Sequence, residues 1–472
     1  MKAKMTGLMA VSVVLTAAIY QSCVENDKTG KLQPITPQDI PTNVVAGFNF
    51  PESQDTINGW LGSQDTVSIT NHAWGIWAGL TANSNQVYGT DTLLIYETWL
   101  GVSDLAAACA AGNSQGGCAI TKTTREQLHF PRQIAHAASL LKATPGAKAG
   151  NPTDDNASTY VSVSYNPGAA CYATNNLIFN QSALSKFKVS GGIGAIPAFP
   201  NNAITIKPTY FIGKTSDGLV QIPAWQGEPT NPYVVYSPSA WNSYVYADVT
   251  NKQPKGKIAV PAPANASAQQ ISDATINLDE FISYPIDALA AYYMNKQQLA
   301  QTNDTLKAGD LAILTAMHVA TKETSNWTWQ TFFWTINPAQ PDFPSSAWQA
   351  KLQPTAQLNG AAAHYALATC YAMVWPNQPV TGGTNTNARA IIGYNPYLEP
   401  GLPAPFGNVN ALNSTYQYGM QTNCMSCHAY ATQFKNTPYS ADQYVDMKDT
   451  IFNNSVQLDF AWSINQNVNT NK

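Results

Sequence analysis

Near the C-terminal end of the chain, two cysteines and a histidine form a group with the spacing C-x-x-C-H. They are Cys424, Cys427 and His428, within the stretch QTNCMSCHAYA at 421–431. This spacing is the attachment signature of a c-type haem. Two thiols form thioether bonds to the two vinyl groups of one macrocycle, and the next residue places an imidazole nitrogen on the iron. The motif therefore predicts one covalent haem c, with Cys424 and Cys427 as attachment sites and His428 as the proximal iron ligand.

Two other kinds of site also use a C-x-x-C pair. A thioredoxin-like redox pair lies at the strand-to-helix junction of a βαβ unit, and the run before Cys424, NALNSTYQYGMQTN, is not typical of such a strand. A zinc site needs further Cys or His ligands nearby. After Cys370 the sequence contains no Cys or His outside the motif. Haem attachment is therefore the interpretation that the motif favours.

A second axial ligand would have to come from elsewhere in the chain, and Met317 and His318 are the leading candidates. Neighbouring residues point in different directions on a helix or a strand, so only one of them can face the iron. We prefer His318, because a histidine in an apolar run is costly unless it is bonded. Met317 is the runner-up, and a core histidine bonded to a carbonyl is another interpretation. The remaining alternatives are an open site, Met420, Met447, His364, His72, His129 and His136.

The run WTWQTFFW at 327–334 carries alternating aromatic residues. In a strand, Trp327 and Trp329 share one face. They are candidates for an aromatic wall that keeps a haem dry, although ordinary core packing explains them equally well. Glu97, Glu399 and Arg389 are candidates for contacts with the haem propionates, and exposed polar residues are the commoner explanation for such side chains.

The first residues have the pattern of an export signal. Lys2 and Lys4 precede an apolar run at 7–19, which is too short to span a bilayer. Ser22 then precedes Cys23, as at a bacterial lipoprotein cleavage site. We expect residues 1–22 to be a signal peptide and Cys23 to be lipidated, with ordinary cleavage and a free Cys23 thiol as the alternative. The expected location is the bacterial cell envelope, with the protein anchored in the periplasm or at the outer membrane.

The other cysteines suit an oxidising compartment. Cys109, Cys118, Cys171 and Cys370 remain, an even number that allows two disulfides in three possible pairings. Cys109 and Cys118 flank a Gly-rich turn, so we prefer the pairs Cys109–Cys118 and Cys171–Cys370.

Composition limits the function further. Charged residues make up 11% of the chain and hydrophobic residues 44%, and the net charge is −4. No basic block is present, which argues against a nucleic-acid partner, because phosphate binding needs clustered Lys and Arg. A polar surface built from Asn, Gln, Ser and Thr is commoner in exported proteins.

We expect an α+β fold, β-rich, with short helices and long irregular loops. Residues 23–44 are predicted to be a polar tether and 45–472 a single large haem-bearing globular region, with the haem-attachment segment at about 405–472. The predicted strands lie at 92–100, 159–165, 203–213, 233–237 and 327–334. The predicted helices lie at 132–142, 284–300, 310–322 and 359–373, with Asp310 as an N-cap.

Several segments together resemble a group of exported bacterial single-haem proteins known as the cytochrome c family. The segments are AMHVATKETSNWTWQTFFW (316–334), YNPYLEPGL (394–402), NCMSCHAYA (423–431) and, more weakly, HAWGIWAGL (72–80) with ETWL (97–100). The resemblance implies haem binding and electron transfer, with no defined substrate.

The leading functional prediction is therefore an envelope c-type cytochrome. Its partner would be a redox protein or a quinone-linked chain, and its lipid anchor would bind a membrane. One alternative is a haem enzyme, for example a peroxide-reducing one, with an open distal iron. The other is a haem-based sensory or binding module.

Overall fold

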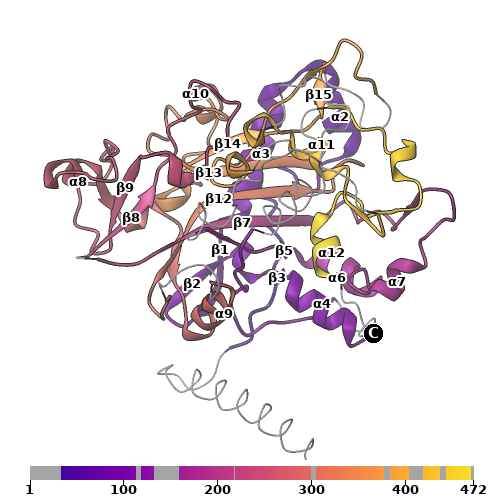
Figure 1. Cartoon of the computed structure of the whole chain (residues 1–472), viewed down its shortest axis with the longest axis horizontal. Helices are drawn as coiled ribbons and strands as arrows, with labels where there is room; N and C mark the ends of the chain where they lie inside the picture. The colour runs from indigo at the N-terminus through magenta and orange to yellow at the C-terminus, as the bar shows by residue number, and fades with distance from the viewer. Residues whose placement is uncertain are drawn as a thin grey trace, which may run out of the picture.

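The computed structural model describes residues 33–112, 118–131, 159–216, 218–298, 305–376, 383–402, 418–435 and 443–468. The fold is α+β and β-rich, as predicted, with short helices and long connections around a central sheet (Figure 1). The predicted signal peptide and Cys23 lie outside the described residues. Among the residues that are described, no helix is long and apolar enough to cross a membrane.

The described helices and strands have the following bounds. The α-helices are α2 (Gln54–Ser63), α3 (Thr66–Leu80), α4 (Val102–Ala110), α6 (Pro167–Asn175), α7 (Gln181–Ser185), α8 (Ala268–Ala274), α9 (Ala288–Gln298), α10 (Ala347–Ala350), α11 (Cys424–His428) and α12 (Trp462–Asn467). The 3₁₀ helices are η1 (Ile95–Thr98), η2 (Pro238–Ala240), η3 (Leu278–Glu280), η4 (Gly360–His364), η5 (Glu399–Gly401), η6 (Gly419–Gln421) and η7 (Thr450–Phe452). The strands are β1 (Asn83–Tyr88), β2 (Asp91–Leu94), β3 (Leu100–Gly101), β4 (Thr159–Val161), β5 (Ser164–Tyr165), β6 (Gly194–Ala195), β7 (Ile204–Gly213), β8 (Leu219–Pro223), β9 (Tyr244–Asp248), β10 (Thr275–Asn277), β11 (Ser283–Pro285), β12 (Leu311–Thr321), β13 (Thr328–Trp334), β14 (Tyr365–Thr369), β15 (Val374–Trp375), β16 (Arg389–Ala390), β17 (Thr432–Gln433) and β18 (Val456–Gln457).

The largest sheet in the described part of the chain has eight strands. Its main path runs β14-β13-β12-β7-β5-β3, with β11 also paired to β12 and β4 to β7. Every pairing in it is antiparallel. The long strands β7, β12 and β13 form the centre of this sheet and of the molecule (Figure 1). This sheet is the platform on which the candidate site is built.

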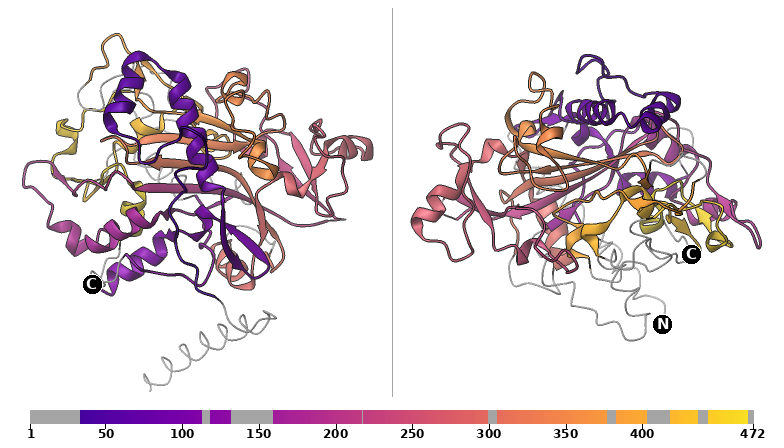
Figure 2. Two further views of the ribbon diagram at one scale, coloured as in Figure 1. Left: turned by 180° about the vertical axis from the view of Figure 1, so that it is seen from behind. Right: turned by 90° about the horizontal axis from the view of Figure 1, so that it is seen from above.

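The two faces of the sheet are covered by different parts of the chain. The helices α2 and α3 lie on one side of the central strands, and the C-terminal segment lies on the other (Figure 2). Trp77 of α3 stacks on Phe332 of β13, with ring centroids 4.5 Å apart. On the opposite face, Trp329 of β13 lies 4.2 Å from the His428 ring of α11. Alternation along β13 therefore separates a helix-covered face from the face that meets the C-x-x-C-H motif.

Two of the predicted α-helices are wrong, because each segment contains a strand of the central sheet. Residues 311–321 form β12, and the predicted helix at 359–373 is η4 followed by β14. Local helix propensity from Ala, Leu and Met is overridden there by pairing with partner strands on both sides of β12 and of β13. The helix predicted at 284–300 is confirmed for α9 at 288–298, whereas 284–285 belong to β11, and the helix predicted at 132–142 lies outside the described residues.

Most of the predicted strands are confirmed. Strands β4 and β5 fall within 159–165, β7 within 203–213 and β13 within 327–334. Residues 92–100 divide among β2, η1 and the start of β3, and 233–237 are not a strand.

The predicted tether at 23–44 is wrong for its described part, residues 33–44. Ile35 and Ile40 are buried, and Ile35 forms an antiparallel bridge with Lys122. The indole of Trp99 donates a hydrogen bond to the Gln38 carbonyl at 2.7 Å. These apolar and backbone contacts fix the segment on the globular body, so any tether ends before it.

The disulfide pairing predicted from the sequence is also wrong. The structure joins Cys118 to Cys171. Cys109 lies on the buried face of α4, four residues after the buried Leu105, and its thiol contacts the Ala173 carbonyl at 3.6 Å. Helical spacing therefore turns Cys109 toward the core and away from Cys118. Cys370 is likewise free and buried, at the end of β14.

Candidate functional site

The C-x-x-C-H motif forms the short helix α11, and the preceding Asn423 holds it in place. The Asn423 side-chain oxygen accepts a hydrogen bond from the Ser426 amide at 2.9 Å, which is an N-cap. Its amide nitrogen donates to the carbonyls of Ala372 at 3.0 Å and Ile391 at 2.9 Å. One fully buried side chain thus ties the motif to two distant segments.

His428 is held in the tautomer that a metal ligand requires. Its Nδ1 lies 2.8 Å from the Phe460 carbonyl. A carbonyl only accepts, so Nδ1 carries the proton and Nε2 keeps its lone pair. Burial lowers the pKa of His428 to about 3, so the ring stays neutral at ordinary pH. A carbonyl partner of this kind orients the ligating histidines of metal sites.

The carbonyl that orients His428 lies on a strained loop. Asp459 and Phe460 both have positive φ angles, 47° and 69°. The Asp459 carboxylate accepts a hydrogen bond from the Lys322 ammonium at 2.6 Å and another from the Phe199 amide at 2.9 Å. Left-handed backbone in residues other than glycine costs energy and persists where surrounding contacts impose it. These contacts therefore fix the direction of the Phe460 carbonyl.

A cavity opens between this motif and the exposed face of the sheet. It contains about 1020 Å³ of space not filled by protein, part of it open to solvent. The predicted site residues that line it are Cys424, Cys427, His428, Trp327, Trp329 and His318. The fold therefore brings together residues that are more than 100 positions apart in sequence.

Trp327 lines the cavity and carries a buried donor. Its side chain is 2% exposed, and its φ of 62° is left-handed, so it is not part of the following strand as predicted. Its indole Nε1 is buried and finds no hydrogen-bond acceptor among the described residues. Buried donors are normally paired. A bound group with acceptor oxygens, such as the carboxylates of a haem, would satisfy it.

His318 lines the cavity, but both of its nitrogens already have partners. Nδ1 lies 2.7 Å from the Thr331 hydroxyl, and Nε2 lies 3.1 Å from each carboxylate oxygen of Glu399. Glu399 also accepts a hydrogen bond from the Asn395 amide at 2.7 Å. Iron ligation by His318 would therefore break a buried contact with a carboxylate. This geometry disfavours the predicted ligand, which stays a prediction.

Glu399 and Lys207 add opposite charges to the same cavity wall. Burial raises the pKa of Glu399, but the charge and hydrogen bonds of His318 outweigh it, and the net shift is downward. Lys207 is the registered partner of His318 on β7. Burial lowers the pKa of Lys207 to about 8, although Glu399 opposes the shift. The wall thus offers an amine and an imidazole from the sheet and a carboxylate from η5.

The other candidate ligands lie elsewhere. Met317 faces the opposite side of β12 and packs in the core that contains Phe332 and Trp77. Met420 is buried in the cluster around Trp225, and Met447 packs at the edge of the cluster that contains Met425. His129 contacts the Phe130 carbonyl and His364 lies near Glu280, whereas His136 is outside the described residues. Within the described ranges, no group of three His, Cys, Asp or Glu side chains could hold a metal ion.

Of the three residues suggested for propionate contacts, one lies at the cavity and two lie elsewhere. Glu399 lines the cavity. Glu97 instead forms an ion pair with Arg125, and the Arg389 guanidinium lies over the Trp375 ring.

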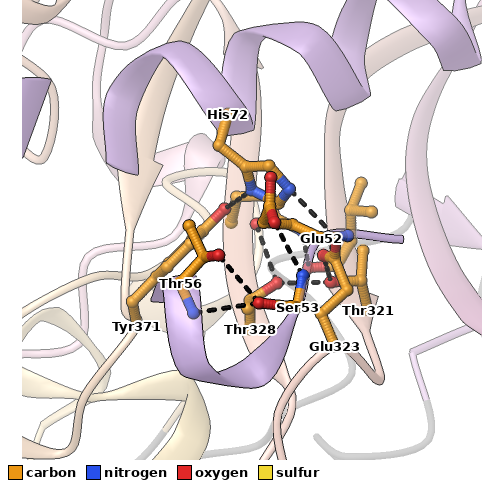
Figure 3. Close-up of polar contacts among 10 residues, drawn as sticks. Glu52, Ser53, Thr56, His72, Thr321, Glu323, Thr328 and Tyr371 are labelled. Carbon is orange, nitrogen blue, oxygen red and sulfur yellow. Dashed lines mark hydrogen bonds and ion pairs between the residues drawn. The ribbon is translucent and has the colours of Figure 1, made fainter. Parts of the chain in front are cut away.

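A second polar cluster lies on the opposite face of the sheet, around His72 of α3 (Figure 3). His72 contacts the Tyr371 hydroxyl at 2.7 Å and the Glu323 carboxylate at 3.0 Å. Glu323 also accepts hydrogen bonds from the Glu52 amide and the Thr321 hydroxyl. These bonds link α3 and the start of α2 to the β12–β13 hairpin. Both His72 nitrogens are engaged, and we interpret the cluster as a structural clamp.

Sequence reasoning missed Asn423, Lys207, the Phe460 carbonyl and the Gly393 carbonyl, which the Cys370 and Cys424 thiols both contact. Asn423 had a usable signal, because Asn directly before a short helix is a common N-cap. The other three depend on strand register and tertiary contacts, for which the sequence offers no local pattern.

Comparisons of the chain with protein-family models, with curated proteins and with solved structures find no match. The resemblance to the cytochrome c family therefore stays a prediction.

Proposed function

We propose that this chain is a c-type cytochrome that carries one covalent haem and transfers electrons. The observation that carries the proposal is the meeting of Cys424, Cys427 and His428 with Trp327 and Trp329 around one cavity. The motif has the required spacing, and a cavity opens beside it.

The roles of the residues follow from their positions. Cys424 and Cys427 would form the two thioether bonds, and the Nε2 of His428 would bind the iron. Trp329, whose ring lies 4.2 Å from that of His428, would exclude water from the ligand side. Trp327 Nε1 would donate to a propionate carboxylate. The haem supplies a one-electron couple, and the protein sets its potential through the axial ligands and burial.

A haem enzyme is the second candidate, and one observation favours it. His318 and Glu399 form a hydrogen-bonded acid–base pair in the cavity wall, with neither His318 nitrogen presented for ligation. Such a pair can hold or release a proton beside a small molecule bound at an open iron position.

The optical spectrum of the purified protein distinguishes the two candidates. Electron transfer predicts low-spin spectra in both oxidation states and slow or absent carbon monoxide binding to the reduced protein. The ligand would then be an amine or imidazole of the cavity wall. Lys207→Ala and His318→Ala form a matched pair on registered strands, and loss of the low-spin spectrum in one of them identifies it. A high-spin wild type that binds carbon monoxide quickly would overturn electron transfer in favour of the enzyme.

We also propose that the mature protein is held in the bacterial envelope by a lipid on Cys23 and exchanges electrons with a redox protein or a quinone-linked chain. The export pattern at 1–22 supports this location. Wild type should partition with membranes, and Cys23→Ser should be found in the soluble fraction. A wild type that is wholly soluble would contradict the anchor.

A further inference from the structure

A third thiol lies against the haem-attachment motif. Cys370 follows β14 directly, and its amide donates to the Trp329 carbonyl at 2.8 Å, which continues the pairing with β13. Its side chain is 1% exposed. The backbone of Cys370 is therefore fixed to the same strand that carries the aromatic wall of the cavity.

The thiols of Cys370 and Cys424 meet at one backbone carbonyl. Both point at the Gly393 oxygen, which lies 3.8 Å from Cys370 Sγ and 3.3 Å from Cys424 Sγ. Among the described hydrogen bonds, the Cys427 thiol shares no such acceptor with Cys424. Cys370 and Cys424 are both free in this structure and lie beside one another, although 54 residues separate them in sequence.

Gly393 makes this approach possible. A Cβ at position 393 would lie 2.3 Å from Cys370 Sγ. The Gly393 amide donates to the Thr422 carbonyl at 2.9 Å, and Gly393 pairs with Asn423 in a parallel bridge. The end of β14, the Gly393 segment and the start of α11 are thus locked together around the two sulfurs.

We propose that Cys370 is the disulfide partner of Cys424 in the chain before haem attachment. The proposal rests on the proposed function in one respect, that Cys424 is later a thioether sulfur. The two thiols lose two protons and two electrons when the S–S bond forms. A protein disulfide of the envelope accepts them by exchange, through a mixed disulfide, and leaves as a dithiol.

This bond would control haem attachment. Cys424 in a disulfide cannot add to a vinyl group, so attachment at Cys424 requires that a dithiol reductant first return Cys370 and Cys424 to thiols. Cys427 would stay a thiol throughout. The arrangement protects Cys424 from pairing with other thiols during export.

The test maps cysteines in the full mature chain, exported in a host without the haem-attachment apparatus. Thiols are trapped by acid and alkylation, and unreduced peptides are identified by mass. We expect a Cys370–Cys424 link, with Cys427 alkylated. A Cys424–Cys427 link, or alkylation of both Cys370 and Cys424, would overturn the proposal.

Two variants serve as a matched comparison, because Cys370 and Cys109 are both buried free cysteines. Cys370→Ala should lose the link and take up haem without added reductant, whereas Cys109→Ala should behave like wild type. Cys370→Ser repeats the test with a side chain of similar size in case Cys370→Ala fails to fold.

Failure of this proposal and failure of the proposed function look different. If haem attaches in the presence of the apparatus but no Cys370–Cys424 link forms in its absence, the disulfide proposal fails and the function stands. If the link forms and persists with the apparatus present and no haem is attached, the disulfide stands as a permanent crosslink and the haem function fails.

Discussion

Individual side chains decide what the cavity can bind. His428 is neutral because burial lowers its pKa, and its tautomer is set by one carbonyl. Trp327 offers an unpaired buried N–H, and Lys207 offers a buried amine. A buried N–H without an acceptor costs stability, and a haem bound as proposed would pair the Trp327 N–H with a carboxylate.

The His318–Glu399 pair should be worth more to stability than an exposed ion pair. The side chains are 15% and 14% exposed, so removal of one partner leaves a largely buried charge or dipole. We expect His318→Ala to lower the free energy of unfolding by about 3 kcal/mol. The double variant with Glu399→Gln should cost less than the sum of the single variants. Urea unfolding of all four proteins measures the coupling, and strictly additive costs would contradict it.

Glu126 should give the protein a pH-dependent stability. Burial raises the pKa of Glu126 to about 8, and the nearby Lys122 only partly offsets it. In the unfolded chain a Glu titrates near 4.3. Between these values the folded state binds more protons, so stability falls as pH rises, by at most about 1.4 kcal/mol per pH unit.

Glu126→Gln removes this titration. Relative to wild type, the variant should therefore gain stability steadily between pH 5 and pH 8. Urea unfolding at a series of pH values in that window gives the comparison. A difference between the two proteins that does not vary with pH would show that Glu126 is charged in the folded state.

At the scale of elements, the short helix α11 depends on Asn423 more than on its own five residues. Asn423→Ala removes the N-cap and leaves the carbonyls of Ala372 and Ile391 without their donor. We expect a loss of about 2–4 kcal/mol and a lower yield of attached haem.

Asn180→Ala is the matched control, because Asn180 caps the equally short α7 and its side-chain oxygen accepts from Ser182 and Ala183. It should cost about 1 kcal/mol and leave haem attachment unchanged. Equal losses in stability and in haem yield for the two variants would contradict the special role of Asn423.

How much of the site was predictable differs between elements. The C-x-x-C-H spacing is a local signal with one dominant chemistry, and it predicted the motif residues that line the cavity. Residues 311–321 lack such a signal, because Leu, Ala and Met suit a helix and only the partners β7 and β13 make the segment a strand. That error hid the register that places Lys207 beside His318. Trp327 and Trp329 both line the cavity, although Trp327 precedes β13 in a left-handed conformation, and their role as a haem wall stays a prediction.

The described part of the molecule is organised as a sheet with a helical layer on one face and the cavity beside α11 on the other. The Cys118–Cys171 bond closes a loop of 53 residues beside α6. Unreduced peptide mapping should recover this link, and Cys118→Ser with Cys171→Ser should lower stability by about 2–4 kcal/mol. Recovery of a Cys109–Cys118 link instead would contradict the packing of Cys109 against Ala173.

The central claim is that Cys424 and Cys427 hold one haem covalently, and intact mass under denaturing conditions tests it most directly. Wild type, exported in a host with the haem-attachment apparatus, should carry the added mass of one haem and keep its haem stain after denaturation. Cys424→Ser with Cys427→Ser should lose both, and Cys109→Ser should keep both. A wild type with no added mass, or a double variant that retains covalent haem, would contradict the account.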